Sequence, residues 1–319
     1  LDSRFELYKL LLPEISAAEV SDVMREMYPD RGSLLLITAP EGVDDIPSEE
    51  ALQQLWTSAG KDRDITAYSE DSLDRPLFPE EPASEPGTVV SRQVLSPDGV
   101  IQLVLSNGAT VVLHPTEFRE NEVLFSAFSR GGTSLIEDAA VPSSQVAVNY
   151  TELSGLNGFD PVALQKKLSS FSVSVSPWID ESYEGFSGSA SRDDTELLFQ
   201  LINLYFTKPD FTEQGWSSLM TQMRAHAENR RAKPEEQFSD MLKELLYGKN
   251  FRFSNLTEEI VSKMDRDVAE RVYRERFSGA DDFVFVFTGS FSEDEITGFA
   301  EKYLAVLPAA GKAEEAVPI

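Results

Sequence analysis

The fold of this chain is decided by residues 122–168, which read EVLFSAFSRGGTSLIEDAAVPSSQVAVNYTELSGLNGFDPVALQKKL. Side chains alternate over 123–129 until the glycine pair at 131–132, a pattern that predicts a strand running into a turn. Four residues then recur at i, i+3, i+4 and i+7 on one helix face: Val146, Asn149, Tyr150 and Leu153. Gly155 is the expected cap of this helix, and a second helix is expected over 162–168.

This helix face raises a question of function, because positions 146, 149 and 150 have the spacing of an inverted zinc motif. In the motif H-x-x-E-H, two histidines one turn apart hold the metal, and a glutamate lies beside the metal-bound water. Here the three positions hold Val146, Asn149 and Tyr150. Both histidine ligands and the general base are absent, so we assign no catalytic residue and no metal ligand to this chain.

The surrounding sequence nevertheless resembles the pitrilysin-like (M16) zinc metallopeptidases over residues 100–308. The resemblance is carried by LSNGATVVL at 105–113, by LFSAFSRGGTS at 124–134, and by Gly155 beyond the second ligand position. In that family a third ligand, a glutamate, follows on a downstream helix, and its counterpart by residue count is His226. The degenerate positions of the motif are then Val146, Asn149, Tyr150 and His226.

The resemblance implies the non-catalytic domain that occurs in the C-terminal half of two-half family members. If the alignment is correct, Val146 and Tyr150 share one helix face, and the helix that bears His226 crosses directly over it. We therefore expect the side chains of Val146, Tyr150 and His226 to converge, with Asn149 beside them, because a shared zinc ion would have required that closeness.

The remaining pattern predicts an α+β fold in which helices pack on one face of a mostly antiparallel sheet, as in M16 peptidase or LuxS-like domains. A hairpin is expected over 100–114, turned at Asn107-Gly108. Further strands are expected at 171–176, 183–191 and 283–287, and helices at 194–206, 213–231, 235–246 and 293–304.

Four segments are expected along the chain. They are the C-terminal tail of a preceding M16-type domain at 1–60, an acidic Pro-rich linker at 61–95, the non-catalytic M16-type domain at 96–310, and the start of the next linker at 311–319. The linker composition has too few apolar residues to build a core, which predicts an extended, semi-rigid strap. Because the chain starts without methionine and in mid-pattern, we expect a fragment of a longer protein.

The first segment repeats part of the later domain. A helix is expected before Pro13, another behind a capping box of Ser16 and Glu19, and an acidic helix at 48–59. Between them, the uniformly apolar run at 33–38 predicts a buried strand. Residues 23–28 resemble 272–277, so the helix and its closing strand are expected to occur twice, although two short amphipathic helices also resemble each other by chance.

Composition limits the classes of partner. The chain has 28 basic against 55 acidic residues and a formal net charge of −27, which argues against nucleic acid or an anionic membrane surface. It has no cysteine, which excludes disulfides and thiolate metal sites, and no apolar run long enough to span a bilayer. His114, at a strand end, is expected to be structural or exposed rather than a ligand.

Two functions remain open. The first is a segment of an M16-type zinc endopeptidase that degrades peptides or unfolded polypeptides, in which this chain is itself inactive and forms a chamber wall that holds substrate. The second is a non-enzymatic structural or peptide-binding relative. For the first, the resemblance implies that zinc is bound only in an N-terminal half and that this chain has no cofactor. Its expected partners are the other domains of the same polypeptide and peptide substrates, and its expected compartment is a bacterial periplasm or cell envelope.

Overall fold

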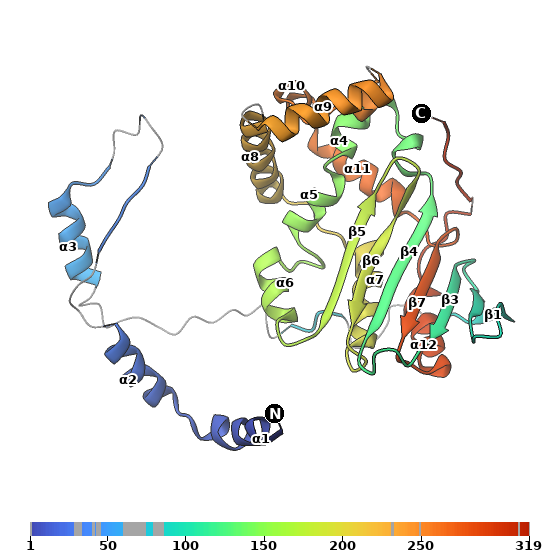
Figure 1. The fold of residues 1–319 in the computed structure, drawn as a ribbon, viewed down its shortest axis with the longest axis horizontal. Helices are drawn as coiled ribbons and strands as arrows, with labels where there is room; N and C mark the ends of the chain where they lie inside the picture. Colours follow the sequence, from blue (N-terminus) through green and yellow to red (C-terminus); the bar gives the residue numbers. More distant parts are fainter. Residues whose placement is uncertain are drawn as a thin grey trace. The chain divides into compact units, whose positions relative to one another are not determined.

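The computed structural model describes residues 2–28, 34–39, 42, 46–59, 75–78, 86–230, 233–248, 250–311 and 313–318. The chain divides into two compact units, Leu1–Tyr68 and Ser69–Ile319 (Figure 1). The predicted linker residues 61–74 and 79–85 lie outside the described residues.

The first unit contains three helices, α1 (Asp2–Leu11), α2 (Ala17–Met27) and α3 (Glu49–Ala59). The predicted capping box is confirmed, because the Ser16 hydroxyl accepts from the Glu19 amide at 3.2 Å and the Glu19 carboxylate accepts from the Ser16 amide at 2.8 Å. No residue of α2 or α3 is buried. These helices therefore carry apolar faces that the described part of the chain leaves uncovered.

The predicted buried strand at 33–38 is not formed by its described residues. Residues 34–38 have no regular secondary structure and pair with no described strand, and Leu34 and Leu36 are exposed. The reason is that a strand satisfies its backbone groups only beside a partner, and an apolar run alone does not supply one. Of the predicted repeat, the described residues thus keep the helix and lack the closing strand.

The second unit is built on a seven-stranded sheet in the order β1-β2-β3-β7-β4-β6-β5. Its strands are β1 (Val89–Val94), β2 (Ile101–Leu105), β3 (Thr110–Pro115), β4 (Val123–Arg130), β5 (Val173–Ile179), β6 (Tyr183–Ala190) and β7 (Val284–Gly289). All neighbours are antiparallel except β3 and β7, which run parallel. The chain returns to insert β7 between β3 and β4, so the two parallel strands end side by side.

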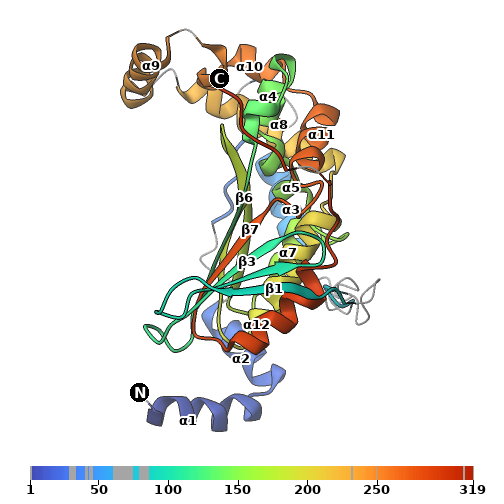
Figure 2. The ribbon, with the colours of Figure 1, turned by 90° about the vertical axis from the view of Figure 1, so that its right-hand side faces the viewer.

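Helices follow the strands in blocks. They are α4 (Val141–Ser144), α5 (Ala147–Ser154), α6 (Pro161–Leu168), α7 (Thr195–Thr207), α8 (Glu213–Arg230), α9 (Pro234–Tyr247), α10 (Glu258–Ser262), α11 (Arg266–Arg276) and α12 (Glu293–Phe299), which a π-helical turn at Ala300–Leu304 continues. Figure 2 shows α7 and α12 on one side of the sheet. The predicted α+β architecture is confirmed. No described helix is long and apolar enough to cross a membrane.

The core lies between the sheet and these helices. Along β4, buried and exposed side chains alternate without a break, so one face of the strand enters the core and the other meets solvent. Aromatic rings fill the layer: Phe125 stacks on Phe287 with ring centroids 5.0 Å apart, and Phe199 of α7 stacks on the same ring at 4.6 Å. The core therefore holds α7 against the centre of the sheet.

The second unit includes residues on both sides of the expected 96–310. Strand β1 falls within the stretch that was expected to be linker. It belongs to the domain instead, because it pairs antiparallel with β2. Upstream of it, Leu77 is buried, and the Arg75 guanidinium donates to the Asn157 carbonyl at 2.7 Å. At the other end, the amide of Val317 donates to the Ser134 hydroxyl at 3.0 Å.

Candidate functional site

Helix α5 carries the positions predicted to correspond to the zinc motif, and it begins one residue after the first of them, Val146. Val146 has φ −120° and ψ 3°, outside the helical range, and is the N-cap of α5. Its carbonyl still accepts from the Tyr150 amide at 2.9 Å, so the two positions keep helical spacing. Gly155 ends the helix with φ +105°, and a Cβ there would lie 2.0 Å from the Phe159 carbonyl oxygen, so the predicted glycine cap is required.

The side chains of Val146 and Tyr150 are buried in an apolar cluster between α5 and α8. We call it the α5–α8 cluster; its buried members are Val146, Tyr150, Leu219, Met220, Ala227, Val261 and Ala269. The ring of Tyr150 meets Phe211 and Trp216 edge-on, with centroids 5.3 and 5.1 Å apart. Helix α8 therefore packs on α5 as predicted, and the contact is hydrophobic.

His226 is the exception, and the predicted convergence with Tyr150 is not found. Its side chain is exposed, whereas Ala227 beside it is buried in the α5–α8 cluster. The helical period explains the difference, because Leu219, Met223 and Ala227 follow one another at four-residue steps, and His226 lies about 100° around the helix from Ala227. Counting residues along the chain placed His226 on a helix that packs against α5, but His226 lies on a face of α8 that does not meet α5.

These residues do not fit a zinc ion. Valine has no donor atom, tyrosine is a poor zinc ligand, and the α8 residues opposite them are apolar. Burial raises the pKa of the Tyr150 hydroxyl, which favours the protonated form and further weakens it as a ligand. Among the described residues, no three His, Asp or Glu side chains lie close enough to hold a metal. Asn149, expected at the general-base position, is exposed, and its amide has no base chemistry.

Two of the buried charged side chains of this domain, Glu184 and Arg276, lie elsewhere in a group that the sequence analysis did not find, whereas buried Arg230 pairs separately with Glu236 and Asp240. Glu184 of β6 is 1% exposed and accepts from the Gly132 amide at 2.5 Å. Arg276 of α11 is also buried, with its Nη1 3.8 Å from Glu184 and 2.6 Å from Glu314. We call Glu184, Arg276 and Glu314 the β6–α11 charge cluster. They lie far apart in the sequence and match no motif spacing, so no local signal indicates them.

Burial dominates the electrostatics of this charge cluster. It raises the pKa of Glu184 to about 7, against the opposing effects of the Gly132 amide and the Arg276 guanidinium. Nearby Asp282, which accepts from the Glu314 amide at 3.2 Å, also has its pKa raised by burial. Arg276 and Glu314 also line an open pocket of about 680 Å³. Within the described part of the chain, no group of His, Asp or Glu side chains there could hold a metal.

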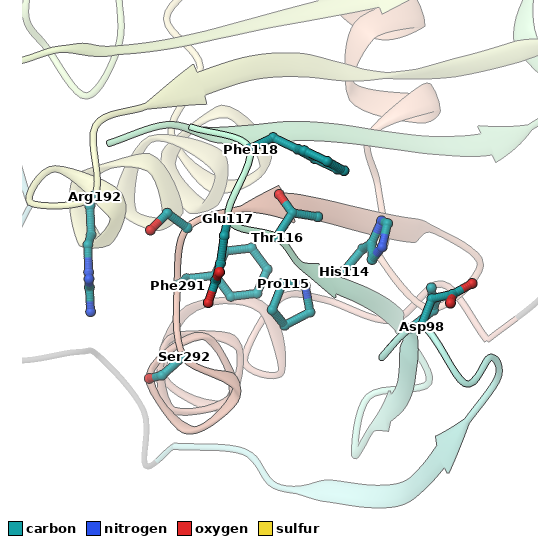
Figure 3. A pocket seen from close by; sticks show the side chains of 11 residues that line it. Asp98, His114, Pro115, Thr116, Glu117, Phe118, Arg192, Phe291 and Ser292 are labelled. Atoms are coloured by element: carbon teal, nitrogen blue, oxygen red, sulfur yellow. The ribbon is translucent and has the colours of Figure 1, made fainter. Parts of the chain in front are cut away.

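An open pocket lies where the parallel strands β3 and β7 end (Figure 3). Its volume is about 870 Å³, and His114, Phe118, Arg192 and Phe291 are among the residues that line it. His114, expected to be structural or exposed, is half-buried in its wall, and its imidazole has no hydrogen-bond partner among the described residues. Lone histidine, arginine and carboxylate groups here form no triad and no metal group within the described part of the chain.

Comparison with known proteins supplies the context of this fold. No family model matches the chain. It is 23% identical over 304 residues to the zinc protease PQQL-like of Arabidopsis thaliana, and 25% identical over 226 residues to the probable zinc protease PqqL of Escherichia coli. The chain thus resembles pitrilysin-like (M16) zinc proteases, as the sequence predicted.

Solved structures agree on this M16 fold. The crystal structure of the periplasmic protease PqqL from Escherichia coli matches 85% of the chain with a TM-score of 0.65 and 23% identity. The M16 inactive domain from Pseudomonas fluorescens matches 68% of it, and the chain covers 54% of that structure, with a TM-score of 0.53 and 18% identity.

The chain spans only part of its M16 relatives. The region aligned with the Arabidopsis protein is 95% of this chain but 29% of that protein. The region aligned with the Escherichia coli protein is 69% of this chain but 24% of that protein. The chain likewise covers 30% of the PqqL structure. Most of the length of each of these relatives therefore has no counterpart in this chain.

Proposed function

We propose that this chain is a non-catalytic segment of an M16-type zinc endopeptidase, and that it forms a wall of the peptidase chamber and holds peptide substrate. One observation carries the proposal: the helix positions that correspond to the zinc motif are filled by an apolar cluster. Val146 and Tyr150 are buried in one cluster with Leu219 and Ala227, and among the described residues no three His, Asp or Glu side chains lie close enough there to hold a metal. A site packed in this way stabilises a domain and supplies no water-activating group.

The relatives support the peptidase context of the proposal. Those named above are described as zinc proteases, and one similar structure is the ferredoxin protease FusC in complex with Arabidopsis ferredoxin, with a TM-score of 0.62 and 17% identity. In the proposed protein, residues 1–60 end a preceding domain, and 96–310 with the flanking strands form the non-catalytic domain. Zinc belongs to an N-terminal half, and the compartment is the periplasm or cell envelope, as for PqqL of Escherichia coli.

The proposal predicts that the chain binds no stoichiometric zinc. After equilibration with micromolar zinc and gel filtration, elemental analysis is expected to find far less than one zinc per chain. Peptide hydrolysis by the pure chain is expected to stay at background with or without a chelator. About one zinc per chain, together with chelator-sensitive hydrolysis, would contradict the proposal.

A designed variant introduces zinc-binding side chains at positions of α5 and α8 that face each other in this structure. Val146→His, Asn149→Glu and Tyr150→His are combined with Met223→Glu, because Met223 lies on the stripe of α8 that packs against the α5–α8 cluster. This variant is expected to bind zinc in the same assay, although burying polar groups lowers its stability. A control with His226→Glu in place of Met223→Glu is expected to bind zinc more weakly, since position 226 is exposed.

A further inference from the structure

Four segments converge on the pocket at the ends of β3 and β7, and backbone hydrogen bonds fix three of them. The Thr116 amide donates to the Gly289 carbonyl at 2.8 Å, and the Ser290 amide donates to the Glu122 carbonyl at 3.0 Å. The Arg192 amide donates to the Asn121 side chain at 3.0 Å. The fourth segment is the turn between β1 and β2, where the Asp98 amide donates to the Ser96 hydroxyl at 3.1 Å. The pocket is therefore a preformed feature of the fold.

The pocket has an apolar middle and opposite charges at its ends. Figure 3 shows Pro115 and Phe291 between Arg192 at one end and Asp98 at the other. Phe118 stands at the rim with 91% of its surface exposed, which is unusual for a large aromatic ring in a folded domain. A ring so placed offers a stacking surface to whatever enters the pocket.

The charged groups of the pocket differ in their partners, and the Asp98 carboxylate accepts from the Ser96 hydroxyl at 3.3 Å. Within the described part of the chain, neither the Arg192 guanidinium nor the Glu117 carboxylate has an ion-pair or hydrogen-bond partner. By contrast, the guanidinium groups of Arg230, Arg252 and Arg276 each meet at least one carboxylate. An unpaired arginine beside an apolar floor, in a chain of net charge −27, is a specific anchor for an acidic group.

We propose that this pocket binds an extended peptide segment with an apolar side chain between an acidic group, which meets Arg192, and a basic group, which meets Asp98. The apolar side chain lies on Pro115 and Phe291 and against the ring of Phe118. A polyanion is disfavoured, because one arginine faces the two carboxylates of Asp98 and Glu117. The volume is within the range of roughly 300–1,000 Å³ that is usual for specific ligand pockets.

This inference rests on the proposed substrate-holding function and locates peptide binding in the pocket at the ends of β3 and β7. The test uses fluorescence anisotropy with blocked, dye-labelled octapeptides whose central residues are acidic, phenylalanine and basic in that order. Two matched peptides replace the phenylalanine by serine or the acidic residue by a basic one. Blocked termini ensure that the side chains alone supply charge.

Two variants test the pocket. Phe118→Ser is expected to weaken binding of the parent peptide about tenfold, because it removes the stacking surface. Arg192→Glu is expected to weaken it by a similar factor and to recover affinity for the peptide that carries a basic residue in the acidic position. Both side chains are exposed, so thermal unfolding is expected to be unchanged and serves as the folding check.

Matched controls lie outside the pocket. Phe171→Ser removes another exposed phenylalanine, and Arg224→Glu reverses another exposed arginine. Neither is expected to change affinity more than about twofold. Wild-type affinity in both pocket variants would overturn the site and leave the proposed function standing. Absence of binding by the wild-type chain at millimolar peptide would overturn both.

Discussion

The α5–α8 cluster and the β6–α11 charge cluster are both buried in the second unit, yet they are made of opposite chemistry. The first lies at the positions of a zinc motif and contains only apolar side chains and one tyrosine. The second lies at no motif and holds Glu184 and Arg276 in the interior. The difference teaches that the positions predicted for the zinc motif serve packing, while the Arg276–Glu314 ion pair joins the domain to its own C-terminal residues.

The contributions of the two clusters to the free energy of unfolding should also depend differently on pH. Packing of apolar side chains depends on volume and contact, and is nearly independent of protonation. A buried carboxylate with a raised pKa couples folding to proton uptake. Each substitution below either sharpens this contrast or breaks it, and the expected effects decrease from the first to the last.

Tyr150→Ala is expected to give the largest loss of stability. Tyr150 is 1% exposed and packs against Phe211 and Trp216, so truncation leaves a cavity and costs about 4 kcal/mol of unfolding free energy. Urea unfolding followed by tryptophan fluorescence measures it at pH 5.5 and pH 8, and the loss should be the same at both. Tyr150→Phe keeps the volume and should cost less than about 1 kcal/mol. A costly Tyr150→Phe would show that the hydroxyl, not the ring, matters.

Glu184→Gln is expected to stabilise the chain, with a gain that depends on pH. Burial raises the pKa of Glu184 to about 7 from its ordinary value of 4.5, so the favourable protonated state is lost as pH rises through 7. The gain should be near zero below pH 4.5, grow between pH 4.5 and 7, and level off above, at about 2 kcal/mol. Urea unfolding across pH 4.5–8.5 measures it. A gain that is constant with pH would show that Glu184 does not titrate in this window.

Much of the fold could be predicted, because the strands and helices of this domain place apolar residues at regular intervals along the sequence. The alternation over 123–129 predicts β4, the Asn107-Gly108 pair predicts the turn between β2 and β3, and both are found. The parallel placement of β7 between β3 and β4 could not be read from local pattern, since it depends on pairing between residues far apart. The run at 33–38 failed for the same reason, because an apolar segment does not specify its partner.

The candidate site could be predicted only in part. The spacing of Val146 and Tyr150 located a buried helix face, and the face is there. The position of His226 was wrong because a count along the chain does not fix helical phase, which changes by about 100° per residue. The β6–α11 charge cluster and the pocket beside Phe118 join residues from separate elements, so only the folded structure brings them together.

Glu314→Gln is expected to have the smallest effect, and its value lies in how that effect depends on Glu184. The Arg276 guanidinium lies between the two carboxylates, 2.6 Å from Glu314 and 3.8 Å from Glu184. At pH 8 Glu184 has lost its proton in the wild-type chain, and its repulsion of Glu314 cancels part of the attraction that each carboxylate has for Arg276. Glu314→Gln should then cost only about 0.5 kcal/mol, because it removes a favourable and an unfavourable interaction together.

In the Glu184→Gln background the repulsion is gone, so Glu314→Gln should cost more, about 1 kcal/mol at pH 8. The wild-type chain at pH 5.5 should behave like that background, because Glu184 then carries a proton in the folded state. A double-mutant cycle by urea unfolding at the two pH values measures the coupling. Equal costs of Glu314→Gln in both backgrounds at pH 8 would show that the carboxylates act independently. The β6–α11 charge cluster would then be two separate ion pairs, and its contrast with the α5–α8 cluster would rest on Glu184 alone.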